Sequence, residues 1–361
     1  MRVRLARGGI RVLVSLVVFA LVAAACSSGE DDSTASGGEC TPPDTPVISF
    51  VAYSTPREAY GKIIPAFQSM WKDTHDGQSV IFQESYAGST TQAANIIGGY
   101  EADVVALSLA SDVEVIVDAD LITHDWTKAP DKGMVSTSVV VLDVRPGNPL
   151  GLKDFDDLTK PGVEVLTPDP ASSGGARWNL VAAYGAAMRG YAGNQKGDEA
   201  GAAALIEGIA KNILTLDKSA RDSIQNFENG IGNIAITYEN EVMTANEAGL
   251  LDEAVYPPST ILIENPAAVV DVYAEKHCVM DVAEAFVEFL HTPEVKDMYK
   301  SVGFLRPTDL AEAKKGDPAN GFPPIEDLFT VADFGGWPAL DELLFSIPDG
   351  IATKAIAEAA G

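Results

Sequence analysis

The chain has 361 residues, of which 52 are acidic and 25 are basic, so its formal net charge is −27 with neutral histidines. A chain of this length can bury a large core and is long enough for two domains. Because such an acidic surface repels nucleic acid, we expect no nucleic-acid partner.

The first 25 residues are typical of a secretory signal peptide, with four arginines, an apolar run over residues 12–22 and then small residues. A transmembrane anchor is the alternative, but the apolar run is shorter than the ~18 to 20 residues that a span needs. Small residues directly before Cys26 resemble a bacterial lipobox, which implies cleavage there and a lipid on the Cys26 thiol. The mature chain would then carry 21 basic and 52 acidic side chains, a charge of −31, and be anchored to the outer face of the cell membrane.

Residues 26–46 follow as the lipidated cysteine and a polar stretch, SSGEDDSTASGGECTPPDTP, that predicts a flexible tether. Two cysteines remain, Cys40 and Cys278. Outside the cytoplasm such a pair is often joined, but geometry cannot be checked from sequence, so a disulfide stays open. The four histidines are scattered and form no ligand spacing with either cysteine, so we predict neither a metal site nor a cofactor.

From Val47 onward, strand patterns alternate with helix patterns. Such βα alternation predicts mostly parallel sheets flanked by helices, and its extent predicts two α/β domains. The predicted strands are 47–53, 80–84, 103–109, 138–144, 163–166, 213–216 and 233–238; clear helices are 56–71 and 90–100.

A third helix is predicted within PDPASSGGARWNLVAAYGAAMRG, residues 168–190, with Ser172 or Ser173 at the N-cap. The first N–H groups of a helix lack internal partners and carry the positive end of its dipole. Gly174 and Gly175 have no side chains to block an approach, so an anion could bind there. The alternative is an ordinary capped helix with a glycine turn.

Four short turns join a predicted strand to a predicted helix and contain Ser, Gly or Ala. In open α/β sheets, ligands bind outside the carboxyl ends of the strands, where these turns lie. Several helix N-termini could therefore converge on one small anion, although capping residues also occur in such turns for purely structural reasons. The turns are 54–56, 87–89, 172–175 and 218–220.

Four segments resemble the sulfate-binding proteins that serve ABC-type sulfate and thiosulfate importers: SYAGSTTQAANIIGGYEADVVALSLASDVE, TPDPASSGGARWNLVAAYGAAMR, GIGNIAITYENE and VEFLHTPEVKDMYKSVGFLRPTD. The likeness runs from about Val47 to about Ile356. It implies a two-lobed α/β fold of the type II periplasmic-binding-protein kind, with hinge strands between the lobes. The implied boundaries are 47–134 and 261–321 for lobe I, 135–260 for lobe II and 322–361 for a C-terminal tail.

The resemblance also implies a sulfate site made of uncharged donors. The implied residues are Ser54, Ser89, Gly174, Gly175 and Ala220 through their backbone N–H groups, with Ser173 and Tyr238 through their side chains.

The chain departs from the family pattern at several of these positions. Tyr238 replaces a Trp, and Ser54 replaces an Asp. Tyr86 and Ala87 occupy positions where the family has His and Gly, and Ser219 and Asp222 occupy positions where it has glycines. These four residues lie beside the predicted donors.

These departures bear on the choice of ligand. Sulfate only accepts hydrogen bonds, whereas phosphate at neutral pH carries a proton that a donor-only site leaves unpaired, at a cost of ~1 to 3 kcal/mol. Asp222 or the Tyr238 hydroxyl could accept that proton, although the helical pattern favours a solvent-facing Asp222. Thiosulfate, molybdate or tungstate, and phosphate remain alternative ligands.

An enzyme is the main alternative of another class, with Ser173 as the nucleophile of a hydrolase. The chain has no G-x-S-x-G elbow and no recognisable histidine partner, so we predict that it is not an enzyme. It also lacks the phosphate-binding loop of an ATPase. The resemblance implies an ABC permease and its ATPase as partners, and we expect a monomer.

Overall fold

The computed structural model describes residues 40–304, 306 and 308–360. The predicted signal peptide, the predicted lipid site at Cys26 and the tether up to residue 39 lie outside the described residues. Within the described ranges, no helix is both long enough and apolar enough to span a bilayer.

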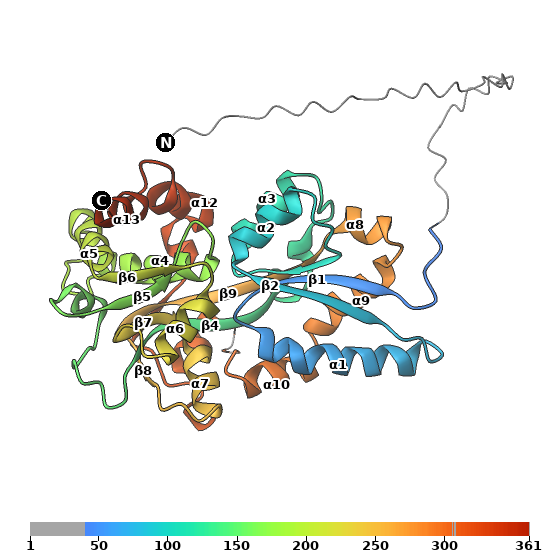
Figure 1. Cartoon of the computed structure of the whole chain (residues 1–361), viewed down its shortest axis with the longest axis horizontal. Coiled ribbons are helices and arrows are strands. Elements are labelled where there is room, and N and C mark those ends of the chain that lie inside the picture. The colour runs from blue at the N-terminus through green and yellow to red at the C-terminus, as the bar shows by residue number, and fades with distance from the viewer. Residues whose placement is uncertain (1–39, 305, 307, 361) are drawn as a thin grey trace, which may run out of the picture. The chain divides into compact units, whose positions relative to one another are not determined.

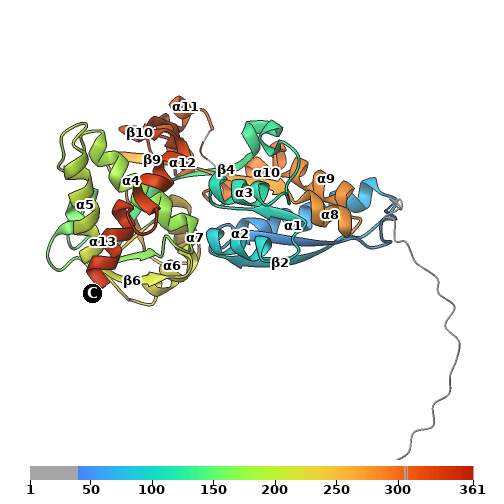
Figure 2. The same cartoon turned by 90° about the horizontal axis from the view of Figure 1, so that it is seen from above.

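Lobe I contains a sheet in the order β2-β1-β3, with both pairs parallel. Helices cover this sheet on its two faces (Figures 1 and 2). The elements of lobe I are β1 (Val47–Tyr53), α1 (Arg57–Thr74), β2 (Ile81–Ala87), α2 (Ser89–Ile97), β3 (Val104–Ala106), α3 (Ala110–Asp118), α8 (Asp271–Lys276), α9 (Met280–Leu290) and α10 (Pro293–Ser301).

Lobe II repeats this plan around a sheet in the order β7-β5-β6, again with parallel pairs. Its elements are β5 (Val165–Pro168), α4 (Gly174–Met188), α5 (Glu199–Lys211), β6 (Ile213–Asp217), α6 (Ala220–Glu228), β7 (Ile234–Tyr238), α7 (Glu239–Glu247) and β8 (Glu253–Val255). The βα alternation thus predicted the layers of both lobes.

Two long strands, β4 (Met134–Val144) and β9 (Ser259–Val269), pass between the lobes (Figure 1). They pair with each other antiparallel, so that Ser138 lies opposite Ile263. Strand β9 also pairs antiparallel with β3, and β4 pairs antiparallel with β7. The sheets are therefore parallel within the lobes and antiparallel where the lobes join.

The C-terminal part of the chain packs on lobe II. Strand β10 (Asp327–Phe329) lies parallel to β9, and α13 (Ile351–Ala360) packs against α5. Trp337 lies edge-on to Trp178 of α4, with ring centroids 4.7 Å apart. The elements between these contacts and before them are α11 (Leu310–Lys315), η5 (Val331–Phe334), α12 (Gly336–Leu340) and the π-helical turn η6 (Asp341–Phe345).

Each lobe has its own hydrophobic core. In lobe I, Phe50, Phe67 and Phe286 meet edge to face, with centroids 5.0 to 5.5 Å apart for the two pairs that involve Phe286. In lobe II the core surrounds α4, which is buried along almost its whole length. The sequence left open whether Cys40 and Cys278 are joined. In this structure a disulfide joins Cys40 to Cys278, which lies between α8 and α9.

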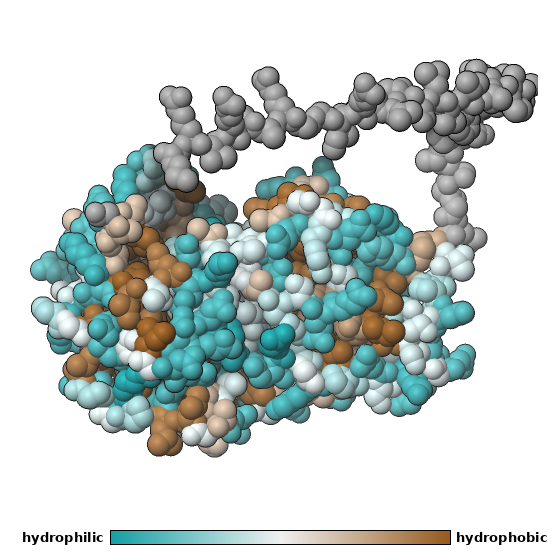
Figure 3. Space-filling model, in the orientation of Figure 1, coloured by the Kyte–Doolittle hydropathy of each residue, from teal (hydrophilic) through white to brown (hydrophobic). Residues whose placement is uncertain are grey.

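The visible surface is largely hydrophilic, with separate apolar patches (Figure 3). One patch lies over β6, the edge strand of lobe II, where Leu214 and Leu216 are 49% and 37% exposed. The apolar patches on this face are therefore local.

Candidate anion-binding site

The four predicted turns become the starts of four helices, two in each lobe. In lobe I, α1 begins three residues after Ser54, and α2 begins at Ser89. In lobe II, α4 begins at Gly174, with Ser173 as its N-cap, and α6 begins at Ala220. Each helix N-terminus carries partial positive charge and unpaired N–H groups, as an anion site requires.

Turns from the two lobes touch each other at Gly88. A Cβ placed on Gly88 would lie 2.3 Å from the carbonyl oxygen of Ser172 and 2.6 Å from that of Lys218, so only glycine fits. The Thr91 N–H also donates to the Ser172 carbonyl across this contact, at 3.1 Å. The loops before α2, α4 and α6 therefore meet between the lobes.

The predicted backbone donors lie around this contact. A Cβ placed on Gly175 would be 3.1 Å from the Ala220 Cβ and 3.7 Å from the Tyr238 ring. Ser54 lies beside them, because the N–H of Arg221, the residue after Ala220, donates to the Ser54 hydroxyl at 3.4 Å. Ser89 joins the group through Ser108, which lies against Gly174.

Their N–H groups share one property: no described residue accepts a hydrogen bond from any of them. All five residues are buried, and buried N–H groups without acceptors are rare in folded proteins. These unpaired donors are at Ser54, Ser89, Gly174, Gly175 and Ala220.

The two predicted side-chain donors are also buried. Ser173 is 2% exposed and occupies the N-cap of α4, but its hydroxyl makes no capping hydrogen bond. Its oxygen lies 3.5 Å from the Cβ position built on Gly175. The Tyr238 hydroxyl lies 2.7 Å from the Ser108 hydroxyl, and burial raises the pKa of Tyr238 further above its usual range, so the phenol stays protonated.

Three carboxyl groups lie close to these donors. Asp222, which the sequence could not place, is exposed and accepts a hydrogen bond from the Ser219 hydroxyl at 2.9 Å. Asp112 is buried and accepts from the Ser89 hydroxyl at 2.5 Å; burial raises the pKa of Asp112 to about 6. Asp112 could not be recognised from the sequence, because an acidic residue in the first turn of a helix is an ordinary feature.

A third carboxyl group, Glu241, belongs to a contact that bridges the lobes through Arg221. The Arg221 guanidinium donates to the Thr55 carbonyl of lobe I at 3.0 Å and lies 2.6 Å from the Glu58 carboxylate. It also lies 3.3 Å from buried Glu241, whose pKa burial raises to about 7 against the opposing effect of Arg221. The cation beside Ala220 is therefore paired with acids, and the donors facing the centre are uncharged.

A groove of about 670 Å³ opens from this region to solvent. Both lobes line it, and so do the departures from the family pattern at Tyr86, Ala87, Ser219 and Asp222. Asp222 is exposed at the groove entrance, and Tyr86 and Ala87 are half-buried. Ser219 is 5% exposed and is the N-cap of α6, directly before Ala220.

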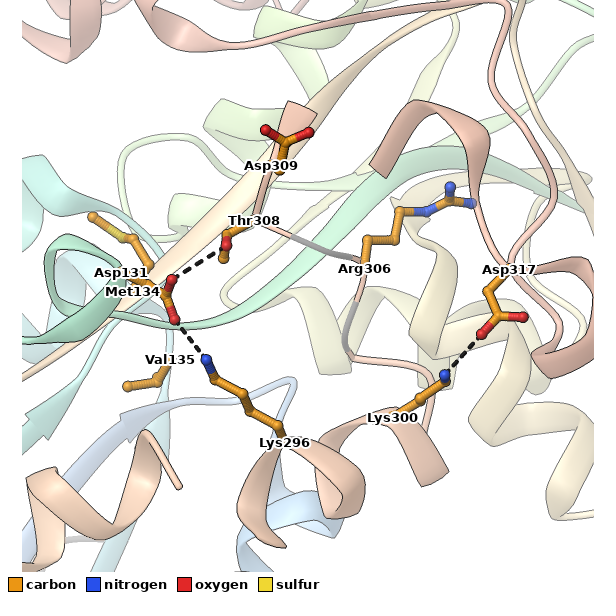
Figure 4. Close-up of a pocket in the computed structure, with 9 residues that line it drawn as sticks. All are labelled: Asp131, Met134, Val135, Lys296, Lys300, Arg306, Thr308, Asp309 and Asp317. Atoms are coloured by element: carbon orange, nitrogen blue, oxygen red, sulfur yellow. Dashed lines mark hydrogen bonds and ion pairs between the residues drawn. The ribbon is translucent and has the colours of Figure 1, made fainter. Parts of the chain in front are cut away.

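A second cavity of about 300 Å³ lies beside α10 and the start of β4 (Figure 4). Its cations are already paired: the ammonium groups of Lys296 and Lys300 lie 2.8 and 2.7 Å from the carboxylates of Asp131 and Asp317. The Arg306 guanidinium pairs with a buried glutamate. With its positive charge neutralised, this cavity is a weaker candidate for an anion than the ring of N–H groups.

Two lobes joined by two strands, with unpaired N–H groups from both lobes around one contact, fit a solute-binding protein. The model of the bacterial extracellular solute-binding protein family matches residues 48–305, and the chain belongs to this family.

Individual relatives cover most of the chain. A sulfate-binding protein of Synechococcus elongatus is 42% identical over 323 residues, 89% of each chain. A thiosulfate-binding protein of Pseudomonas aeruginosa is 34% identical over 300 residues, 82% of this chain and 88% of the relative. The solved structure of the sulfate-binding protein SubI of Mycobacterium tuberculosis, 35% identical, superposes with a TM-score of 0.74 and covers 83% of this chain and all of that one. The resemblance inferred from sequence motifs is thus confirmed.

Proposed function

We propose that this protein captures sulfate outside the cytoplasm and delivers it to an ABC importer. The observation that carries the proposal is the ring of five buried N–H groups, drawn from both lobes, that have no acceptor among the described residues. A tetrahedral dianion would accept these hydrogen bonds and so remove the cost of burying them unpaired. The similarity to sulfate-binding proteins supports the same ligand.

The proposed shell consists of the N–H groups of Ser54, Ser89, Gly174, Gly175 and Ala220, with the hydroxyl groups of Ser173 and Tyr238. Donors without a counter-charge favour a fully deprotonated anion, because a proton on the ligand would find no acceptor. The exposure of Asp222, whose carboxylate already accepts from Ser219, supports this donor-only arrangement.

Capture by lobe closure follows from the origin of the donors. An anion held first by one lobe would gain the donors of the other lobe when β4 and β9 flex, and the closed form would then dock on a membrane permease. Transport energy would come from the partner ATPase. Anchoring through a lipid on Cys26 would keep the monomeric protein close to that permease.

Calorimetric titration of the full chain, dialysed free of sulfate, tests the ligand. We expect tight sulfate binding and phosphate binding that is weaker by roughly tenfold or more. Thiosulfate is the second candidate because a thiosulfate-binding protein is 34% identical to this chain, and molybdate completes the series. A preference for phosphate would show that a group in the site accepts a proton and would refute sulfate as the main ligand.

The Ser173→Ala variant tests the site itself. Loss of one charge-assisted hydrogen bond should weaken sulfate binding by ~1 to 2 kcal/mol. Ser172→Ala is a matched control, because the neighbouring Ser172 hydroxyl already donates to the Lys218 carbonyl at 2.9 Å. Equal sulfate affinity in wild type and Ser173→Ala would remove Ser173 from the site.

A further inference from the structure

Ser108 is a polar residue in a buried apolar run that the sequence analysis did not single out. It follows β3, lies between Leu107 and Leu109, and has no solvent exposure. A buried serine without partners would destabilise the fold, so its contacts require an explanation.

Every polar group of Ser108 has a partner. Its N–H donates to the Ser89 hydroxyl at 2.9 Å, and its hydroxyl lies 2.7 Å from that of Tyr238. Its carbonyl accepts from the Trp178 indole at 2.9 Å and from the Asn265 amide at 3.0 Å. These partners belong to lobe I, lobe II and the hinge strand β9, so one residue contacts all three parts that must come together on closure.

Ser108 also lies directly against the start of α4. A Cβ placed on Gly174 would be 2.8 Å from the Ser108 Cβ and 2.9 Å from its hydroxyl oxygen, while the Tyr238 ring lies beside Gly175. The hydroxyl pair of Ser108 and Tyr238 therefore adjoins the N–H groups proposed to hold the anion.

The protons of this pair can be counted. Two hydroxyl groups carry two protons, and the bond between them uses one. In either orientation of that bond, the second proton is not used between the two hydroxyl groups, and the pair adjoins Gly174 and Gly175. The pair can thus supply one donor to an anion, whichever hydroxyl carries it.

We infer that Ser108 is a positioning residue of the anion site: its hydroxyl, bonded to Tyr238 across the lobe contact, orients the Tyr238 donor and does so only when the lobes are together. The inference rests on the proposed function, since it assigns a further residue to the same sulfate site. It also accounts for a tyrosine at a position where the family pattern has an indole N–H, because a hydroxyl needs a partner to orient it.

The test compares sulfate binding by full-length wild type, Ser108→Ala and Tyr238→Phe, by calorimetry for the dissociation constant and by stopped flow for the two rate constants. We expect each variant to bind roughly five- to tenfold more weakly, the effect of one hydrogen bond, mainly through faster dissociation. If Ser108→Ala does not fold, Ser108→Cys takes its place in the comparison with Tyr238→Phe. Cysteine keeps a similar side-chain volume and is a weaker hydrogen-bond donor than serine.

Tyr299→Phe provides a matched control, because the Tyr299 hydroxyl donates to that of Tyr60 at 2.9 Å in a buried pair confined to lobe I. This variant should lower the unfolding midpoint but keep wild-type sulfate affinity. If Ser108→Ala bound sulfate with wild-type affinity, the inference would be overturned even if Tyr238→Phe bound more weakly. The proposed function would remain intact. Failure of wild type to bind sulfate would overturn both.

Discussion

His277 shows how strongly one side chain can be held on the acidic surface of lobe I. One ring nitrogen lies 2.7 Å from the carboxylate of buried Asp103, and the other lies 2.8 Å from that of Glu101. A neutral imidazole has one donor, so donation to two carboxylates requires the imidazolium. These two carboxylates raise the pKa of His277, although its partial burial opposes them.

This pairing predicts a pH dependence of stability. Because the folded-state pKa is raised above the unfolded value of about 6.5, the contribution is fully present below that value and is lost as the pH rises through the folded-state pKa. The free energy of unfolding of wild type should therefore fall as the pH rises above about 6.5, and it should fall less in His277→Gln. Urea unfolding across this range measures the effect.

His75→Gln is the control for this experiment, since the His75 ring stacks on Trp71 and pairs with no carboxylate of the described residues. It should keep the wild-type pH slope. Parallel pH profiles for wild type and His277→Gln would contradict an imidazolium at position 277.

At the scale of elements, α4 connects the candidate site to the C-terminal part of the chain. Its first residues are the proposed donors Gly174 and Gly175. Its C-cap, Arg189, pairs with Asp327 of β10 at 2.6 and 2.7 Å. In the last turn, Gly185 allows Phe329 to pack closely: an added Cβ would lie 2.4 Å from that ring.

The Gly185→Ala variant should therefore destabilise the protein. The clash is with a fully buried ring, so overpacking should cost ~1 to 3 kcal/mol and lower the urea midpoint. Gly61→Ala in α1 is the matched change, because a Cβ there meets nothing within 4 Å. It should be neutral or stabilise by up to ~1 kcal/mol, since alanine favours a helix interior. Equal stability of the two variants would mean that β10 does not pack against α4 as described.

The sequence predicted those features that depend on local pattern. Strand β1 has the predicted bounds, and Ser173 is one of the two predicted N-caps of α4, because periodicity and capping are encoded within a few residues. The third predicted strand, 103–109, is shorter in the structure, where β3 covers Val104–Ala106. Its ends are set by distant contacts, such as the bond from the Leu107 N–H to the Pro266 carbonyl.

The site was only partly predictable for the same reason. Strand-to-helix turns identified the N–H donors, because small residues at helix starts leave a mark in the sequence. Ser108 left no such mark, because its four partners lie 19 to 157 residues away along the chain. The pairing of Arg221 with Glu58 likewise joins residues that are 163 positions apart in the sequence, so no local pattern predicts it.

At the scale of the whole molecule, a chain with 52 acidic and 25 basic residues is proposed to bind a dianion. The two facts are compatible because exposed charges are screened beyond ~8 to 10 Å, whereas nearby N–H dipoles set the potential in the buried site. Long-range repulsion should then lower the association rate constant of sulfate and leave its dissociation rate constant from the closed site almost unchanged.

Salt should therefore accelerate sulfate binding. Raising NaCl from about 10 to about 150 mM shortens the Debye length from ~30 to ~8 Å, so the association rate constant should rise several-fold while the dissociation rate constant stays nearly constant. Asp222→Asn removes an exposed acid at the groove entrance and should bind faster at low salt, with a weaker salt response. Glu358→Gln removes an exposed acid on α13 instead and should behave like wild type. Stopped-flow measurement of the three proteins distinguishes an effect of the entrance from an effect of net charge.

An association rate constant that falls as salt is added would contradict this prediction. It would require a net positive potential where the anion enters.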